Sequence, residues 1–242
     1  MTMDSIEISK GVRVTNDRCL IIDDGPTAVI GDLHLGYESA LEDEGMYIPR
    51  MNTRSIRTAI NRILEKYEPS RFVLLGDIKH DFKRAPKECR SEVSTILKTI
   101  SDASEVILVK GNHDNFIQNV LSDERMEVYE NIDLCGFRME HGHVDSGKRP
   151  VVIGHEHPSV RIPGQVGGGV KLQCFVHSKD HGIIIIPPFS PFSSGNDLSA
   201  SQDAFMSPAC RSVDMGTAEI YGISELGMMR LGRLSDIGSL EL

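Results

Sequence analysis

Three short apolar runs in the first half of the chain predict buried strands. They occupy residues 28–30, 72–75 and 106–109. Each run is followed closely by glycine or a polar residue, which is typical of a strand that ends in a tight turn. Apolar residues recur every three or four positions over 52–67, and again from about 86 to 100. This spacing predicts two amphipathic helices between the strands.

The alternation of strand and helix predicts parallel strands that are covered by helices. Asn52 or Thr53 can cap the first helix, and Pro86 suits the first turn of the second. Near the N-terminus, residues 12–14 and 19–22 flank a turn signal, which predicts a hairpin. Because ligands of such sheets bind at the carboxyl ends of parallel strands, we expect the functional site at that edge.

The second half of the chain is predicted to be rich in strands. The glycine-rich stretch 164–171 is not followed by a helical pattern, so we interpret it as a hairpin loop and not as a phosphate-binding loop. Residues 187–215 are rich in Pro, Ser, Gly and Asn and are expected to form a long loop. Strands are predicted near 137–140, 150–153, 170–176, 182–186 and 217–222. We expect one α/β domain that spans residues 1–242.

The composition is that of an ordinary globular protein, with 40% apolar and 25% charged residues among 242. A net charge of −9 argues against a protein coated with positive charge for nonspecific nucleic-acid binding. The five cysteines are widely spaced, form no C-x-x-C pair and are odd in number, so we expect free thiols in a reducing cytoplasm. The longest plainly apolar run, 183–186, is far too short to span a membrane.

Histidine is concentrated in polar clusters that follow the predicted strands. Seven of the nine histidines lie in or beside five such clusters. The clusters are Asp32-Leu33-His34, Gly76-Asp77, Gly111-Asn112-His113-Asp114, His141-Gly142-His143 and Gly154-His155-Glu156-His157. Residues two apart in a strand face the same side, so we expect Asp32 and His34 to point together at one ion. Carboxylate, amide and imidazole ligands without thiolate admit Mn, Fe, Zn or Ni. A closed structural zinc site fits less well, because it needs only four ligands and often uses cysteine.

These five clusters, in this order, resemble the motifs of the calcineurin-like metallophosphoesterase superfamily. The chain is more closely similar to archaeal proteins related to SbcD, the nuclease subunit of a double-strand-break repair complex. That likeness covers nearly the whole chain and rests on residues 31–38, 48–50, 76–80, 154–158 and 187–192. The resemblance implies an α/β fold, namely a four-layer αββα sandwich with two mixed sheets.

The resemblance also implies that the clusters hold two divalent metal ions, with Asp77 as the bridging carboxylate. One ion would take Asp32, His34 and His157 as its other ligands. The second ion would take Asn112, His141 and His155. Manganese is the metal that the SbcD-like resemblance favours.

Catalytic roles are implied for two further residues. His113 would face the substrate, where it stabilises phosphoryl charge or protonates the leaving oxygen. Asp114 either orients the His113 imidazole or caps a helix. Three residues outside the predicted ligands and catalytic pair have two possible roles each. His143 either lines the pocket or is a loop histidine. Lys79 and His80 contact either substrate phosphate or solvent.

Two closely spaced cations can shield a phosphodiester, generate hydroxide from water and support the leaving oxygen. The resemblance therefore implies a phosphoesterase that hydrolyses phosphodiester bonds through a metal-bridged hydroxide, as a DNA nuclease. One alternative is a phosphodiesterase for small nucleotides or other phosphoesters. Another is a non-catalytic scaffold, against which the presence of Asp77 and His113 argues. Related nucleases form homodimers, which is the only basis for expecting one here. The chain ends soon after the motifs, which argues against an ATPase partner.

Overall fold

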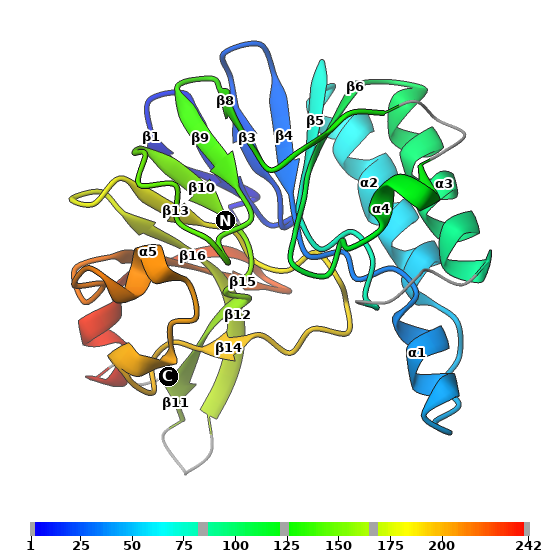
Figure 1. Cartoon of the computed structure of the whole chain (residues 1–242). Helices are drawn as coiled ribbons and strands as arrows, with labels where there is room; N and C mark the ends of the chain where they lie inside the picture. The colour runs from blue at the N-terminus through cyan, green and yellow to red at the C-terminus, as the bar shows by residue number, and fades with distance from the viewer. Residues whose placement is uncertain (1–2, 82–86, 122–125, 165–168, 240–242) are drawn as a thin grey trace.

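Two β-sheets pack face to face, and helices cover their outer surfaces (Figure 1). This computed structural model describes residues 3–81, 87–121, 126–164 and 169–239. Three apolar clusters separate the layers: one between the first sheet and its helices, one between the two sheets, and one under the helices that cover the second sheet. The four-layer αββα arrangement implied by the resemblance is therefore confirmed.

The first sheet is mixed, with seven strands in the order β1 to β7. Its first four strands are antiparallel neighbours, whereas β4, β5, β6 and β7 run parallel. Both faces of the central strands are buried, which is why they are continuous apolar runs in the sequence. The strands are β1 (Ser5–Ser9), β2 (Val12–Thr15), β3 (Leu20–Ile22), β4 (Thr27–Ile30), β5 (Arg71–Leu75), β6 (Glu105–Val109) and β7 (Val128–Tyr129).

The second sheet is also mixed and has nine strands. Its parallel core is β9-β10-β13, and the long strand β12 pairs antiparallel with β11 in its first half and with β13 and β15 in its second half. The strands are β8 (Asn131–Leu134), β9 (Phe137–Glu140), β10 (Val151–Ile153), β11 (Pro158–Pro163), β12 (Gly169–Ser178), β13 (Ile183–Ile185), β14 (Asn196–Asp197), β15 (Glu219–Ser224) and β16 (Gly227–Arg233).

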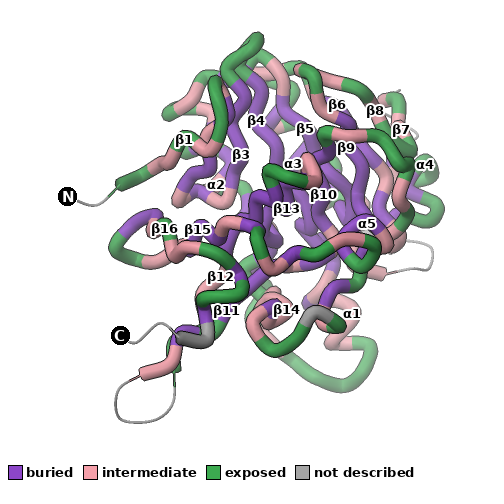
Figure 2. The backbone as a smooth tube through the Cα atoms, turned by 90° about the vertical axis from the view of Figure 1, so that its left-hand side faces the viewer, coloured by how far each residue is buried: buried purple, intermediate pink, exposed green. Residues whose placement is uncertain are grey.

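Helices α2 (Asn52–Tyr67) and α3 (Lys87–Ser101) cover the first sheet. The second sheet is covered by the short helix α5 (Pro208–Arg211) and the 3-10 helices η1 (Gln202–Ala204) and η2 (Leu234–Ser239). Two more helices, α1 (Tyr37–Asp43) and α4 (Ile117–Val120), lie in the loops after β4 and β6. Figure 2 shows the central strands buried and many of the connecting turns exposed.

The predicted strand-helix-strand-helix-strand order of the first half is confirmed, as is the hairpin of β2 and β3. Helix α3 begins at Lys87, and the predicted start at Pro86 lies outside the described residues. Strands β11 and β12 form the predicted hairpin, whose tip at 165–168 is also outside them.

The long loop predicted over 187–215 is wrong, because that stretch contains β14, η1 and α5. Of the β11–β12 hairpin only the loop and the second strand were predicted. Strands β11 and β16 were not, since arginine or glycine interrupts their apolar residues. All five cysteines lie in described residues and are free thiols. Within the described ranges, no helix combines the length and apolar character needed to cross a membrane.

Candidate metal centre

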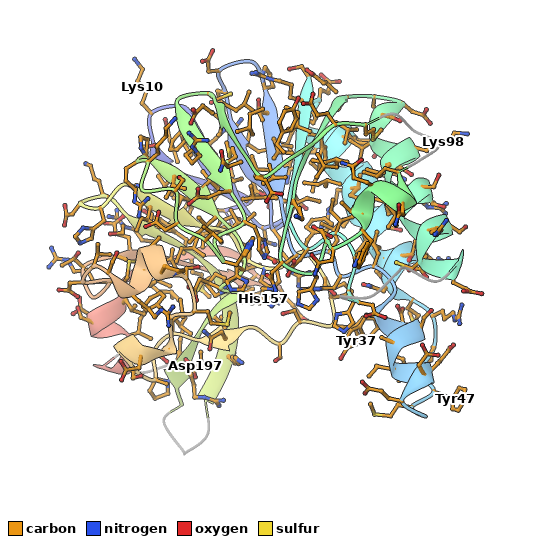
Figure 3. All side chains as sticks on the ribbon, in the orientation of Figure 1. Lys10, Tyr37, Tyr47, Lys98, His157 and Asp197 are labelled. Atoms are coloured by element: carbon orange, nitrogen blue, oxygen red, sulfur yellow. The ribbon has the colours of Figure 1, made fainter. Side chains whose placement is uncertain are left out.

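The predicted metal ligands come from the carboxyl ends of five strands. In the first sheet, β4 leads to Asp32, β5 to Asp77 and β6 to Asn112. In the second sheet, β9 leads to His141 and β10 to His155. The two sheets present these ends to one another, and Figure 3 shows the labelled His157 where the two halves of the molecule meet. The structure thus brings the predicted ligands together from positions far apart in the sequence.

The first donor group consists of Asp32, His34 and His157, whose candidate ligand atoms all lie within 4.8 Å of one another. The Nε2 atoms of His34 and His157 face each other at 3.3 Å, and His157 Nε2 is 3.2 Å from Asp32 Oδ1. Two ligands about 2.1 Å from one ion are separated by roughly 3.2 Å at ordinary coordination angles. The spacing of this group therefore fits a shared cation.

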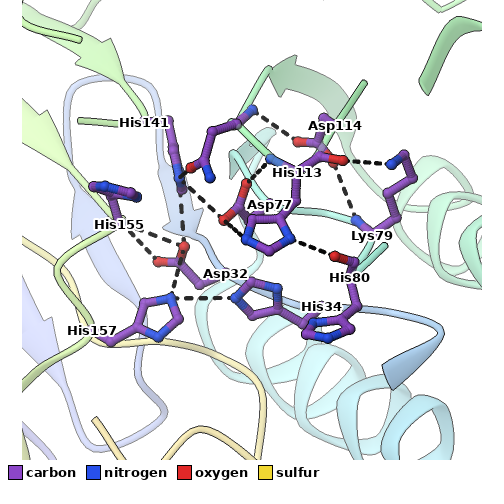
Figure 4. A network of polar contacts seen from close by, with 12 residues as sticks. Asp32, His34, Asp77, Lys79, His80, His113, Asp114, His141, His155 and His157 are labelled. Carbon is purple, nitrogen blue, oxygen red and sulfur yellow. Dashed lines mark hydrogen bonds and ion pairs between the residues drawn. The ribbon is translucent and has the colours of Figure 1, made fainter. Parts of the chain in front are cut away.

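The second donor group consists of Asp77, His141 and His155, again within 4.8 Å. His141 Nε2 is 3.3 Å from Asp77 Oδ2 and 3.1 Å from Asn112 Oδ1. Figure 4 shows both groups side by side in one network of polar contacts. The two groups divide the predicted ligands as the resemblance implied, and their mixed N and O donors fit divalent transition metals.

Five of the predicted ligands have left-handed backbone conformations, which residues other than glycine rarely adopt. The φ angles are 57° for Asp32, 48° for His34, 49° for Asp77, 64° for His155 and 47° for His157. Such residues cost on the order of 1 kcal/mol each and concentrate at functional sites.

The expectation that strand alternation aligns Asp32 with His34 is wrong, because β4 already ends at Ile30. The loop after β4 is instead fixed by hydrogen bonds from its amides to the neighbouring loop. Asp32 N donates to Gly76 O (3.0 Å), and His34 N donates to Asp77 O (2.9 Å).

Two glycines leave room for the ligand side chains. A Cβ atom on Gly76, whose φ is 80°, would overlap the His141 ring. A Cβ atom on Gly111 would overlap Asp77. The glycines of the Gly76-Asp77 and Gly111-Asn112 motifs are therefore required by the close packing of the centre.

The two carboxylates of the centre remain ionised despite their burial. Burial alone would raise the pKa of Asp32, but the adjacent His157 and His141 lower it overall. Burial likewise opposes the shift at Asp77, whose pKa is lowered by its hydrogen bond with His141 and by the charges of His141 and His113. Both side chains are thus in the form that binds a cation.

The histidines of the centre differ in charge. Burial lowers the pKa of both His34 and His155 to about 4, so each ring is neutral and has a free lone pair near pH 7. Burial would also lower the pKa of His141, but the hydrogen bond with Asp77 and the charge of Asp32 raise it to about 9. A metal ion that takes His141 as a ligand would therefore have to displace a proton from it.

Two further contacts orient ligand imidazoles through Nδ1, which leaves Nε2 directed at the centre. His141 Nδ1 is 3.2 Å from Leu75 O, a carbonyl that can only accept. His157 Nδ1 is 3.0 Å from Ser193 Oγ. Hydrogen bonds of this kind fix ring orientation and tautomer in metal sites. Ser193 lies in the segment after β13 and was not predicted as part of the site.

His113 lies at the wall of the site, with its side chain 18% exposed. Its backbone amide donates to Asp77 Oδ1 (2.9 Å), and its Nε2 is 3.8 Å from Asp77 Oδ2. Its Nδ1 contacts the carbonyl oxygen of His80, which can only accept. The proton of a neutral His113 is therefore held on Nδ1.

Asp114 is fully buried and accepts hydrogen bonds from three backbone amides. The donors are Ile78 (3.0 Å), Lys79 (3.2 Å) and Gly111 (2.9 Å). These bonds tie the loop after β5 to the loop after β6. An orienting role of Asp114 for the His113 imidazole stays a prediction. The alternative of a side-chain helix cap is not observed, because α4 has no side-chain cap.

Lys79 is also buried, which contradicts the prediction that it contacts substrate phosphate or solvent. Its ammonium group donates to the carbonyl oxygens of Asp81 and His113. Glu156, between two predicted ligands, accepts hydrogen bonds from the amides of Met206 (3.0 Å) and Ser207, so its role is structural.

The start of helix α2 is held by Glu38 and not by the predicted caps Asn52 or Thr53. Glu38 Oε1 accepts hydrogen bonds from the amides of Met51 (3.0 Å) and Asn52 (2.6 Å). A carboxylate at this position is favoured by the helix dipole. Asn52 Nδ2 in turn donates to His34 O (3.3 Å), so the helix supports the ligand loop.

A cavity of about 350 Å³ opens beside the first donor group and is lined by His34, His113 and His157. Its aromatic wall was not predicted from the sequence. Tyr37, at the start of α1, stacks on Phe192 with ring centres 5.5 Å apart and an angle of 26°. His80 meets the Tyr37 ring edge-on at 4.7 Å, so it too belongs to the cavity. Both aromatic residues lie in stretches that carry the resemblance, but no spacing rule marks them as neighbours.

His143 lies on the other side of the second donor group. It lines a separate cavity of about 130 Å³ together with His141 and Glu140. Its ring centre is 5.5 Å from that of His141. The structure therefore places His143 beside the centre but outside the cavity that contains His113.

The family model for calcineurin-like phosphoesterases matches residues 25–212. The chain belongs to this family. The matched range contains all seven predicted ligands, and the family assignment makes the protein a metal-dependent hydrolase of phosphoesters. No curated protein sequence matches the chain.

A solved structure shows the same fold. The crystal structure of Pseudomonas putida nuclease MPE is similar with a TM-score of 0.66 and 21% sequence identity, over 90% of this chain and 95% of that one. The phosphoesterase Yfce from E. coli is more distant, with a TM-score of 0.38 and 16% identity over 88% of this chain and 94% of that one. The first of these similarities supports the two-sheet fold of this phosphoesterase.

Proposed function

We propose that this phosphoesterase hydrolyses phosphodiester bonds in DNA with two divalent metal ions, for which Mn²⁺ is our first choice. The observation that carries the proposal is the pairing of two donor groups beside a cavity with an aromatic wall. Asp32, His34 and His157 would hold one ion. Asn112, His141 and His155 would hold the other, with Asp77 shared between them.

When bound, such a metal pair neutralises phosphate charge and activates water for attack. The chain's own residues do the rest. Asp114 fixes the loops that present Asp77 and Asn112, as described above. The His80 carbonyl keeps a proton on His113 Nδ1, so a protonated His113 can donate from Nε2 to a leaving oxygen.

The aromatic wall favours a substrate that carries a planar ring next to the scissile bond. Phe192 is 40% exposed and Tyr37 is half-buried, so part of this stacked pair is open to a ligand. Stacking of a nucleobase on an aromatic side chain contributes about 1–3 kcal/mol. The similar fold of a bacterial nuclease gives additional support to a nucleic-acid substrate.

The test is cleavage of labelled single- and double-stranded DNA, beside a chromogenic phosphodiester, with Mn²⁺ and with EDTA. The variants Asp77→Asn and His113→Ala should lose DNA cleavage, while His181→Ala, a histidine outside the site, should keep it. Phe192→Ala should raise KM for DNA about tenfold, as expected for one lost stacking contact. Tyr47→Ala removes an aromatic ring that is 84% exposed, and should leave KM unchanged.

The results of this test distinguish a nuclease, a phosphodiesterase for small substrates and a non-catalytic scaffold. Metal-dependent DNA cleavage that is lost in both site variants supports the nuclease. Turnover of the chromogenic ester with intact DNA would instead indicate a phosphodiesterase for small nucleotides or other phosphoesters. If neither substrate reacts although two metal ions bind, the hydrolytic proposal is wrong and the scaffold alternative gains support.

A further inference from the structure

A second cavity, of about 610 Å³, is larger than the cavity of about 350 Å³ beside the first donor group, which we call the catalytic cavity. It is bounded by the turn between β2 and β3, by α2, by the start of β12 and by the turn between β15 and β16. Two consecutive residues of the segment after β13 line the two cavities: Phe189 lines the larger one, and Ser190 lines the one that contains His113. Ser190 N also donates to Asp32 O (3.1 Å), which fixes this segment against a predicted metal ligand.

Two residues that line this cavity each carry a polar side-chain atom that is buried without a partner. The atoms are Arg18 Nε, a donor, and Asn16 Oδ1, an acceptor. Among the described residues, no hydrogen bond or ion pair satisfies the Arg18 guanidinium. A buried polar group without a partner costs about 1–3 kcal/mol, so it indicates a missing ligand or water. A ligand that satisfies both atoms must offer an anionic acceptor and a donor.

The acidic residues of the cavity do not neutralise Arg18. Asp17 is buried and already accepts from Arg62 Nε (2.5 Å), Lys66 Nζ (3.3 Å) and the Tyr67 hydroxyl (2.8 Å). Glu225 lies exposed at the rim. Burial, and after it the nearby charge of Arg62, lower the pKa of Arg18. An anion beside Arg18 would stabilise its charged form.

The remaining walls are apolar and partly open. Phe189 and Leu172 line the interior, whereas Val170 is 49% exposed and Leu226 is 75% exposed. Apolar walls with a few polar anchors are typical of sites for small organic ligands. The cavity therefore suits a ligand with an apolar body and a charged group, which a simple inorganic anion does not have.

We propose that this cavity binds one nucleotide unit of a polynucleotide strand whose scissile phosphate occupies the metal centre. The phosphate of that unit pairs with Arg18, the base packs against the apolar walls, and a base amino group donates to Asn16. This inference rests on the proposed nuclease function, and it adds a binding site that the catalytic motifs do not include. Binding in this cavity would make KM lower for a strand that reaches both cavities than for a shorter one.

The variant Arg18→Gly tests the inference without the risk of unfolding. Arg18 has a φ of 55°, a conformation that glycine adopts freely, so the variant should melt at or above the wild-type temperature. The control is Arg211→Ala, which removes an exposed arginine that does not line the cavity. Two substrates are compared with Mn²⁺ present: a single strand of roughly a dozen nucleotides, long enough to reach both cavities, and a dinucleotide.

We expect Arg18→Gly to raise KM for the long strand about tenfold, the usual effect of one charged hydrogen bond, with kcat unchanged. The slope of log KM against log salt should fall by about 0.7, the contribution of one phosphate of a single strand. KM for the dinucleotide and turnover of the chromogenic ester should not change. Arg211→Ala should behave as the wild type throughout.

Three outcomes would overturn the inference. If Arg18→Gly and Arg211→Ala give the same KM for the long strand, the cavity binds no part of it, and a water or a free anion fills it. If Arg18→Gly weakens the dinucleotide equally, Arg18 acts through the catalytic cavity. If the wild type cleaves the chromogenic ester but not the strand, the proposed nuclease function fails, and this inference fails with it.

Discussion

Binding of a metal ion to the centre should release a proton from His141. In the metal-free protein this ring lies between two ionised carboxylates, with Nε2 3.3 Å from Asp77 Oδ2 and Nδ1 3.8 Å from Asp32 Oδ1. Burial opposes a charge on the ring, but these two carboxylates raise its pKa to about 9. A ligand nitrogen must be unprotonated, so the metal ion competes with this proton.

The size of the effect follows from the pKa. At pH 7, two units below it, about one molecule in a hundred has a neutral His141, and removing the proton costs about 2.7 kcal/mol. Apparent affinity should therefore rise about tenfold per pH unit until the pH reaches the pKa near 9. His157 adds to this dependence, because Asp32 raises its pKa against the effect of burial. His34 and His155, with pKa values near 4, add nothing above pH 6.

Calorimetric titration with Mn²⁺ in two buffers of different ionisation enthalpy counts the protons released. We expect between one and two protons at pH 7, and a log affinity that increases with pH at a slope of at least one. The control is His181→Ala, which should release the same number. Tight binding with no proton release would refute the reasoning, because His141 would then be neutral before the metal arrives, or would not be a ligand.

Three substitutions test how the site is supported. Asp114→Asn leaves at least one of three buried amides without an acceptor, so the free energy of unfolding measured with urea should fall by about 2–3 kcal/mol; an unchanged midpoint would contradict this role. Glu38→Ala should lower the stability measured by thermal denaturation by about 1–2 kcal/mol, because two amides at the start of α2 lose their carboxylate; no change in melting temperature would show that water replaces it. Gly76→Ala should abolish turnover, because its Cβ meets the His141 ring, whereas Gly136→Ala has a similar φ but open space and should remain active; equal activities would exclude the steric argument.

The central strands could be predicted from the sequence because their burial on both faces leaves uninterrupted apolar runs. The candidate ligands could be selected because five motifs occur in a recognisable order, and the structure brings them together in two groups. Strand alternation nevertheless does not explain why Asp32 and His34 lie together, because β4 ends before both residues. Their alignment depends on left-handed loop conformations and on hydrogen bonds to the loop after β5, which no local periodicity predicts.

The supporting residues could not be predicted for a related reason. Lys79 and Asp114 are ionisable side chains that the fold buries completely, and their hydrogen-bond partners come from another loop. Glu38 precedes the helix that it caps by a full loop, so rules based on adjacent residues point to Asn52 or Thr53 instead. The stacked pair of Tyr37 and Phe192 joins positions that are far apart in the sequence, a contact that only the tertiary fold creates.

The division of the donor groups between two sheets has a consequence for how the protein becomes active. Asp32, His34 and Asp77 are made early by the ribosome, whereas His155, His157 and the Ser193 that orients His157 follow much later. Each sheet alone contributes only part of either donor group. A nascent or half-folded chain therefore lacks part of both donor groups. Both sheets must fold before either candidate metal site is complete.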